Sequence, residues 1–138
     1  MKNFFFSGLA AGVSMFLVMF AFGIFTNMFL PGLVAEYDNT AIFRLWSDPL
    51  TYYMYLHPIL MGFVLAFAWR FFSGFSGGEK SVGRGAMFGL KIWVLFGIPG
   101  MLMTLSTFNV SLLMVLSWTV SVLAQYVIGG IVVTRVSK

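Results

Sequence analysis

Long stretches without a charged side chain dominate the pattern of polar and apolar positions. The three longest occupy positions 3–35, 49–69 and 92–134, which are 33, 21 and 43 residues long. A membrane-spanning helix needs about 20 predominantly apolar residues. The first two stretches therefore each hold one span, and the third is long enough for two spans joined by a tight turn.

The four expected spans are helices rather than strands. The apolar stretches are continuous and rich in Leu, Met, Phe and Ala, whereas the strands of a membrane barrel alternate apolar and polar residues. The turn inside the longest stretch is expected at 106–109, its most polar point. We predict an all-α membrane protein, a single domain over 1–138 with a bundle of four transmembrane helices at about 4–30, 50–72, 85–106 and 110–134.

The distribution of charge predicts the side of the membrane on which each loop lies. Four spans place both termini and the 73–84 loop on one side and the 31–49 loop on the other. Seven of the eight Lys and Arg residues then lie with the termini, while the 31–49 loop holds only Arg44 together with Glu36, Asp38 and Asp48. Because cytoplasmic loops carry the excess of Lys and Arg, we expect cytoplasmic N- and C-termini and an external 31–49 loop.

Composition excludes several classes of protein. Charged residues make up 9% of the 138 positions, against about 25% in an average soluble domain, and apolar residues make up 60%. These values exclude a water-soluble domain and a disordered chain. Eight dispersed basic residues form no patch for nucleic acid. With no cysteine and one histidine, the sequence indicates no metal site and no cofactor.

The 31–49 loop is expected to carry a short external helix at the membrane interface. A residue at 38–40 can cap this helix, and residues 41–46 supply its body with one apolar side. Asp48 followed by Pro49 is typical of an N-cap before a proline at the first helical position. The second span is therefore expected to begin there.

Small and polar residues recur at four-residue intervals on the expected helices. Small residues let helices approach closely in lipid, and a buried glutamine can hydrogen-bond to a neighbouring helix. The pairs Gly8–Gly12 and Gly85–Gly89 have this spacing. On the last helix we predict a packing seam formed by Ser117, Ser121, Gln125 and Gly129, with a transport pathway along the same stripe as the alternative.

Two prolines, Pro58 and Pro99, lie in the outer halves of the second and third spans. A proline within a helix removes a hydrogen bond and kinks the chain. Two kinks at similar depth would open an outer cleft, suited to an apolar molecule or lipid tail with a polar or weakly cationic head. The alternative is that neighbouring side chains fill the gap. The expected lining of the outer cleft is His57, Tyr53, Met101, Met103 and Thr104.

Two basic residues stand near the cytoplasmic end of the third span. Lys91 follows Arg84 by seven residues, which is about two helical turns. A charge at that depth is costly unless the side chain extends to the interface or finds a partner. We therefore expect Lys91 and Arg84 to extend toward lipid headgroups, with an internal polar cavity as the alternative for Lys91.

Several segments together resemble a group of small four-span prokaryotic membrane proteins of unassigned function. The segments that carry this resemblance are EYDNTAIFRLWSDPL, YLHPILMGFVLAF, GLKIWVLFGIPGM and SLLMVLSW. The resemblance implies a prokaryotic plasma (inner) membrane and implies no activity.

The function expected from the sequence is that of an uncharacterised small multi-pass membrane protein, a non-enzymatic binding or accessory protein. Its expected partners are membrane lipids and another membrane protein or a second copy of itself. Two alternatives stay open: a transporter- or channel-like module acting as a homo-oligomer, and a lipid-modifying enzyme at the outer cleft.

Overall fold

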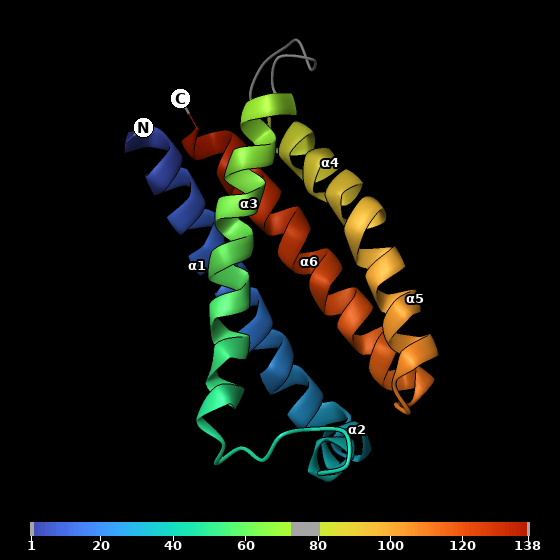
Figure 1. Ribbon diagram of the computed structural model, residues 1–138. Coiled ribbons are helices and arrows are strands. Elements are labelled where there is room, and N and C mark those ends of the chain that lie inside the picture. The colour runs from blue at the N-terminus through green and yellow to red at the C-terminus, as the bar shows by residue number, and fades with distance from the viewer. Residues whose placement is uncertain (1, 73–80, 138) are drawn as a thin grey trace.

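The computed structural model describes residues 2–72 and 81–137, and this part of the chain contains helices and no strand. Figure 1 shows the long helices running between the two ends of the molecule. Most of the predicted 73–84 loop lies outside the described residues. The helices are α1 (Lys2–Phe29), α2 (Pro31–Ala35), η1 (Glu36–Asp38), η2 (Pro49–Tyr55), α3 (Leu56–Phe72), α4 (Val82–Ile92), η4 (Trp93–Gly97), α5 (Ile98–Thr107) and α6 (Leu112–Val136).

Within the described residues, four helical segments are long and apolar enough to cross a membrane. They cover Asn3–Phe29, Pro49–Phe72, Val82–Thr107 and Leu112–Val136, with 27, 24, 26 and 25 residues. These bounds agree with the four spans expected from the sequence. Both termini lie at the same end of the molecule (Figure 1). We call this the basic end, because Arg70, Arg84 and Arg135 lie near it, and we call the other the acidic end, because it carries Glu36, Asp38 and Asp48.

The helices form an open array around α6. Helix α1 packs against both α3 and α6, and α4 packs against the other side of α6. The start of α3 and the whole of α5 therefore lie on opposite sides of α6 (Figure 1). The shared core contains Met15, Leu65, Trp69, Phe88 and Val133.

Glycines allow α1 and α3 to cross with their backbones in contact. A Cβ added to Gly12 would lie 2.8 Å from the backbone of Ile59, and a Cβ on Gly62 would meet the backbones of Gly8 and Gly12. No side chain fits between the two helices here. The Gly8–Gly12 spacing predicted a close helix contact, and the structure places this pair at one.

A second glycine crossing joins α4 to α6. A Cβ on Gly85 would lie 2.6 Å from Cα of Ile131, and a Cβ on Gly89 would meet the carbonyl of Tyr126. From the other side, a Cβ on Gly130 would lie 2.9 Å from the backbone nitrogen of Gly89. The Gly85–Gly89 pair thus lies where the backbones of these helices are in contact.

The third span contains a π-helical turn, η4, before Pro99. The backbone N–H of Ile98 donates to the carbonyl of Trp93, five residues earlier, because Pro99 disrupts the regular ladder. The extra residue shifts the buried face: Gly97, five positions after the buried Ile92, is buried, whereas Phe96 is 65% exposed. The predicted distortion at this proline takes the form of a π turn.

Pro58 lies in the outer half of the second span, as expected. It is the third residue of α3 and follows the tighter 3-10 turns of η2, so a residue that cannot donate a backbone hydrogen bond lies where the helix changes from the 3-10 to the α form. Asp48 caps η2 by accepting a hydrogen bond from the N–H of Leu50 at 2.9 Å, with Pro49 at the first helical position. The predicted start of the second span is confirmed.

The prediction of a helix at 41–46 is wrong. The short helices of this segment are α2 and η1, and residues 40–42 and 46–47 form turns. The side-chain oxygen of Asn39 accepts from the N–H of Ala41 at 3.1 Å, so Asn39 directs a local turn instead of capping a helix. The single turn is not continued, because Phe43 packs against the ring of Tyr37 at 5.1 Å.

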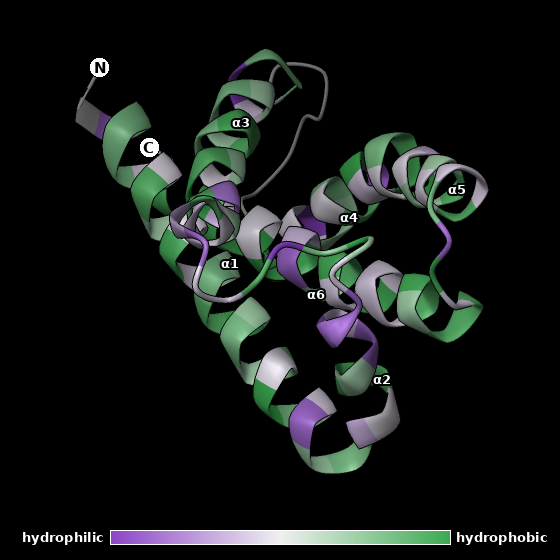
Figure 2. Cartoon of the chain, turned by 60° about the horizontal axis from the view of Figure 1, so that its bottom comes forward, coloured by the Kyte–Doolittle hydropathy of each residue, from purple (hydrophilic) through white to green (hydrophobic). Residues whose placement is uncertain are grey.

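Apolar side chains cover the outside of the array as well as its core. Figure 2 shows hydrophobic residues around the long helices and hydrophilic colour mainly in the connecting segments. Large residues on the outside include Leu17, Phe67, Leu95 and Leu116, which are 59%, 56%, 62% and 51% exposed. A surface of this kind suits lipid or a protein partner.

Candidate functional site

The predicted packing seam is buried along its whole length. Ser117, Ser121, Gln125 and Gly129 each have less than a tenth of their surface exposed. A Cβ on Gly129 would lie 2.8 Å from side-chain atoms of Met15 and Leu65. The seam therefore faces the region in which α6 meets α1 and α3.

The polar groups of the seam bond within α6. The Gln125 amide nitrogen donates to Oγ of Ser121 at 3.2 Å, and the Ser117 hydroxyl donates to the carbonyl of Met114 at 2.8 Å. Gln125 was expected to hydrogen-bond to a neighbouring helix, but this hydrogen bond stays within α6. The seam is thus a packing surface whose polar groups find partners along their own helix.

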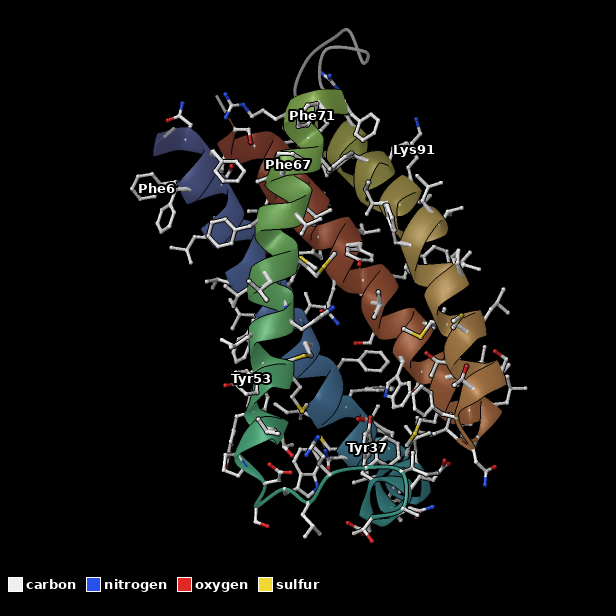
Figure 3. The ribbon with its side chains drawn as sticks, in the orientation of Figure 1. Phe6, Tyr37, Tyr53, Phe67, Phe71 and Lys91 are labelled. Carbon is white, nitrogen blue, oxygen red and sulfur yellow. The ribbon has the colours of Figure 1, made fainter. Side chains whose placement is uncertain are left out.

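The residues expected to line the outer cleft lie on separate parts of the array. Tyr53 on η2 and His57 on α3 are exposed in the part of the second span nearest the acidic end. Figure 3 shows Tyr53 pointing away from α6. Met101, Met103 and Thr104 belong to α5, on the far side of α6. Met103 is 70% exposed, and the Thr104 hydroxyl donates to the carbonyl of Gly100 at 2.9 Å. The 41–46 helix, expected at the same side of the membrane, does not form.

A carboxylate at the acidic end caps α6. Glu36 lies in η1, and its two oxygens accept from the backbone N–H and the hydroxyl of Ser111 at 3.2 and 2.6 Å. Ser111 is itself the N-cap of α6 and accepts from the N–H of Met114 at 3.1 Å. A negative charge is favourable at a helix N-terminus, where backbone N–H groups lack partners. Glu36 thereby fastens the 31–49 loop to the start of α6.

An aromatic cluster around Tyr37, the residue after Glu36, also holds the 31–49 loop against α6. The indole Nε1 of Trp118 donates to the hydroxyl of Tyr37 at 2.6 Å, and their rings lie 6.2 Å apart. The rings of Phe43 and Trp46 lie 5.1 and 6.1 Å from that of Tyr37. Burial raises the pKa of the Tyr37 phenol, and the nearby Glu36 charge adds to this, while the Trp118 hydrogen bond acts in the opposite direction.

The remaining charges of the loop pair locally. Arg44 donates to Asp48 at 2.8 Å in an exposed ion pair. The hydrogen bond from the N–H of Leu50 lowers the pKa of Asp48, and the Arg44 partner lowers it further. Both oxygens of Asp48 therefore have partners, and the residue serves as the N-cap of η2. Among residues 2–72 and 81–137, no three His, Asp or Glu side chains gather as a metal site would require.

The two basic residues expected at headgroups have different surroundings. The Arg84 guanidinium lies 5.0 Å from the ring centre of Trp69 on α3, in a cation–π contact. Trp69 in turn meets Phe88 of α4 edge to face at 5.1 Å. Lys91 is exposed on the opposite side of α4 (Figure 3). The structure therefore separates this pair: Arg84 joins α4 to α3, and Lys91 faces outward.

The sequence did not predict the contacts of three important residues. Trp118 and Trp93 lie within an apolar stretch and stand out only by residue type. The Trp93 indole N–H donates to the carbonyl of Thr119 at 3.2 Å. Glu36 was expected as one of three loop carboxylates, without a specific partner. An indole N–H buried in an apolar span needs an acceptor, and that need was the available signal.

No protein-family model, curated protein or solved structure matches this chain.

Proposed function

We propose that this chain is a non-enzymatic accessory protein of a prokaryotic plasma membrane, with four spans and cytoplasmic termini, that binds another membrane protein. The four helices of spanning length and their apolar outer surface support membrane insertion. Arg70, Arg84 and Arg135 lie near the end of the molecule that carries the termini, opposite the acidic end, and support the orientation.

One observation carries the proposed mode of action: α5 has no buried residue. This ten-residue helix follows the π turn and lies at the edge of the array (Figure 1). Leu102 and Met103 are 62% and 70% exposed. Ile98, Met101 and Thr104 are half-buried and the other seven residues of α5 are exposed, so most of the surface of this helix lies outside the chain's own packing.

The small residues of α5 favour a helical partner at this edge. A Cβ on Gly100 would meet no atom within 4 Å, and Thr104 lies one turn further along the helix. The two described glycine pairs with this spacing, Gly8–Gly12 and Gly85–Gly89, each meet another helix of this chain. By the same geometry, a helix from another protein can approach α5 closely at Gly100.

Site-specific photo-crosslinking in native membranes tests the proposal. A photoreactive side chain at Met103 on α5 is compared with one at Leu60 on α3, which is similarly exposed at 63%. We expect one discrete protein adduct from Met103 and lipid adducts alone from Leu60. The same partner should co-purify in stoichiometric amount with the unmodified chain and be lost from the Gly100→Leu variant.

Other results of this experiment would contradict the accessory role. Adducts to lipid alone from both positions would show that α5 faces only the bilayer. Adducts to a second copy, together with substrate-dependent flux in proteoliposomes, would identify a homo-oligomeric transporter- or channel-like module. Turnover of a purified lipid by the isolated chain would identify an enzyme.

A further inference from the structure

Lys91 stands on the outward face of α4. The buried residues of this helix are Gly85, Phe88, Gly89 and Ile92, of which Gly85 and Gly89 face α6. Lys91, by contrast, is exposed. Its neighbours on the outward face are apolar: Met87 and Leu95 are 51% and 62% exposed. In a membrane, this ammonium group therefore emerges among lipid chains.

The position of Lys91 along the span is too deep for an ordinary interfacial lysine. It follows Val82 by nine residues, or about 13 Å at 1.5 Å per residue. The Val82–Thr107 span of 26 residues is about 39 Å long, which exceeds a hydrocarbon core of about 30 Å by only about 9 Å. If that excess is shared between the two ends, Lys91 starts well inside the core.

The Lys91 side chain extends toward the basic end. Figure 3 shows it directed outward from α4 and toward the end of the molecule that carries the termini. Its flexible four-carbon stem lets the charge approach the interface. An anion in its vicinity would stabilise the charge at the tip further, because a solitary ammonium at the edge of hydrocarbon is costly.

No described carboxylate can serve as that anion. Glu36, Asp38 and Asp48 lie at the acidic end, and the remaining acidic residue, Glu79, falls outside the described residues. Within residues 2–72 and 81–137, the Lys91 ammonium has neither an ion pair nor a hydrogen bond. On a lipid-facing surface near the basic end, the phosphates of phospholipids supply such an anion.

We infer that Lys91 binds the phosphate group of an anionic phospholipid on the outward face of α4, with the acyl chains lying along Met87 and Leu95. The surrounding apolar side chains supply the contact for the chains, and the ammonium supplies the contact for the headgroup. This site is separate from α5 and does not depend on the proposed partner.

Native mass spectrometry of the purified full chain in detergent tests the inference. The protein is titrated with dioleoyl phosphatidylglycerol and, separately, with dioleoyl phosphatidylcholine. We expect Lys91→Gln to lower the affinity for phosphatidylglycerol about five-fold, as about 1 kcal/mol per basic residue near an anionic surface implies, and to leave phosphatidylcholine binding unchanged. Lys91→Arg should retain the preference.

A control separates the site from net charge. Arg44→Gln removes the same charge at the acidic end, and phosphatidylglycerol binding should remain at the wild-type level. An excess of inorganic phosphate should leave the bound lipid in place, because the acyl chains contribute to binding.

Three results would overturn the inference. The first is unchanged phosphatidylglycerol affinity in Lys91→Gln, and the second is an equal loss for both lipids. The third is displacement of the lipid by inorganic phosphate, which would show a site for a free anion. A protein cross-linked at Lys91 together with unchanged lipid affinity would place a carboxylate of a partner protein there and would equally contradict it.

Discussion

The indole nitrogen of Trp118 and the phenolic oxygen of Tyr37 are joined by a 2.6 Å hydrogen bond across 81 positions of sequence. Tyr37 lies in η1, at the acidic end, and Figure 3 shows it near the start of α6. This contact and the Glu36–Ser111 contact fix the 31–49 loop to α6. The loop therefore joins α1 to α6 in addition to connecting α1 with α3 along the chain.

Removing the Tyr37 hydroxyl should destabilise the protein. In Tyr37→Phe, the Trp118 indole N–H loses its acceptor in a half-buried site, and we expect a loss of about 1 kcal/mol in the free energy of unfolding. Thermal unfolding in detergent measures this loss. Tyr52→Phe serves as the control, because the Tyr52 side chain is 62% exposed. Equal stability of the two variants would contradict the structural role of this hydrogen bond.

Alkaline pH should release the loop. Burial raises the pKa of Tyr37 above its ordinary value of 10.0, so the folded state holds the phenolic proton more tightly than the unfolded state. The associated stability is fully present below pH 10 and is lost as the pH rises through the folded-state pKa. We expect the Trp fluorescence of the wild type to change in that range and the corresponding component to be absent from Tyr37→Phe. Identical titrations would refute this assignment.

Glycine substitutions should separate the helix crossings from the open surface. In Gly62→Ala, the added Cβ meets the backbones of Gly8 and Gly12, and we expect destabilisation of about 1–3 kcal/mol. In Gly100→Ala, the Cβ meets nothing within 4 Å, so the change should be neutral or stabilising by up to about 1 kcal/mol. Denaturation of both variants in the same detergent gives the comparison. A tolerated Gly62→Ala would mean that α1 and α3 do not cross here.

The packing seam offers a second matched comparison. Ser121 is 8% exposed, and its neighbour Val120 is 53% exposed. Ser121→Leu should cost about 1–3 kcal/mol, because the larger side chain overfills a closed contact, whereas Val120→Leu should have little effect. Thermal stability in detergent distinguishes them. If both variants unfold like the wild type, the seam faces lipid.

Loss of the α6 cap should be measurable at the acidic end. Ser111→Ala removes the hydroxyl that accepts from Met114 and donates to Glu36, and we expect a cost of about 1 kcal/mol. Glu36→Gln keeps an acceptor oxygen and should cost less. Hydrogen exchange of the first turn of α6 should increase in the order wild type, Glu36→Gln, Ser111→Ala, and the reverse order would contradict the capping role.

The sequence alone predicted the helical spans and the small-residue contacts well. Charge-free length sets the number of spans, and a four-residue spacing of glycines requires a close neighbour wherever the helix is packed. Gly8, Gly12, Gly85 and Gly89 all lie at crossings. The identity of the neighbouring helix was not predictable, because spacing on one helix does not specify its partner.

The 31–49 loop was predicted less well, for a physical reason. The propensity of residues 41–46 favoured a helix, but Phe43 and Trp46 instead pack against Tyr37, and such long-range contacts override local preference. The residues predicted to line the outer cleft do not come together, for a similar reason. The prolines distort the backbone as expected, yet α6 separates the start of α3 from α5 (Figure 1). Position along a span predicts depth and does not predict which spans are adjacent.

Cysteine accessibility tests the membrane arrangement most directly, because the chain contains no cysteine of its own. Single variants Asn39→Cys and Ser137→Cys place one thiol at the acidic end and one at the basic end. In intact cells, a membrane-impermeant maleimide should label Asn39→Cys, and it should label Ser137→Cys only after the membrane is permeabilised. Labelling of both variants from the same side would contradict the four-span arrangement, and labelling of Ser137→Cys alone in intact cells would contradict the cytoplasmic termini.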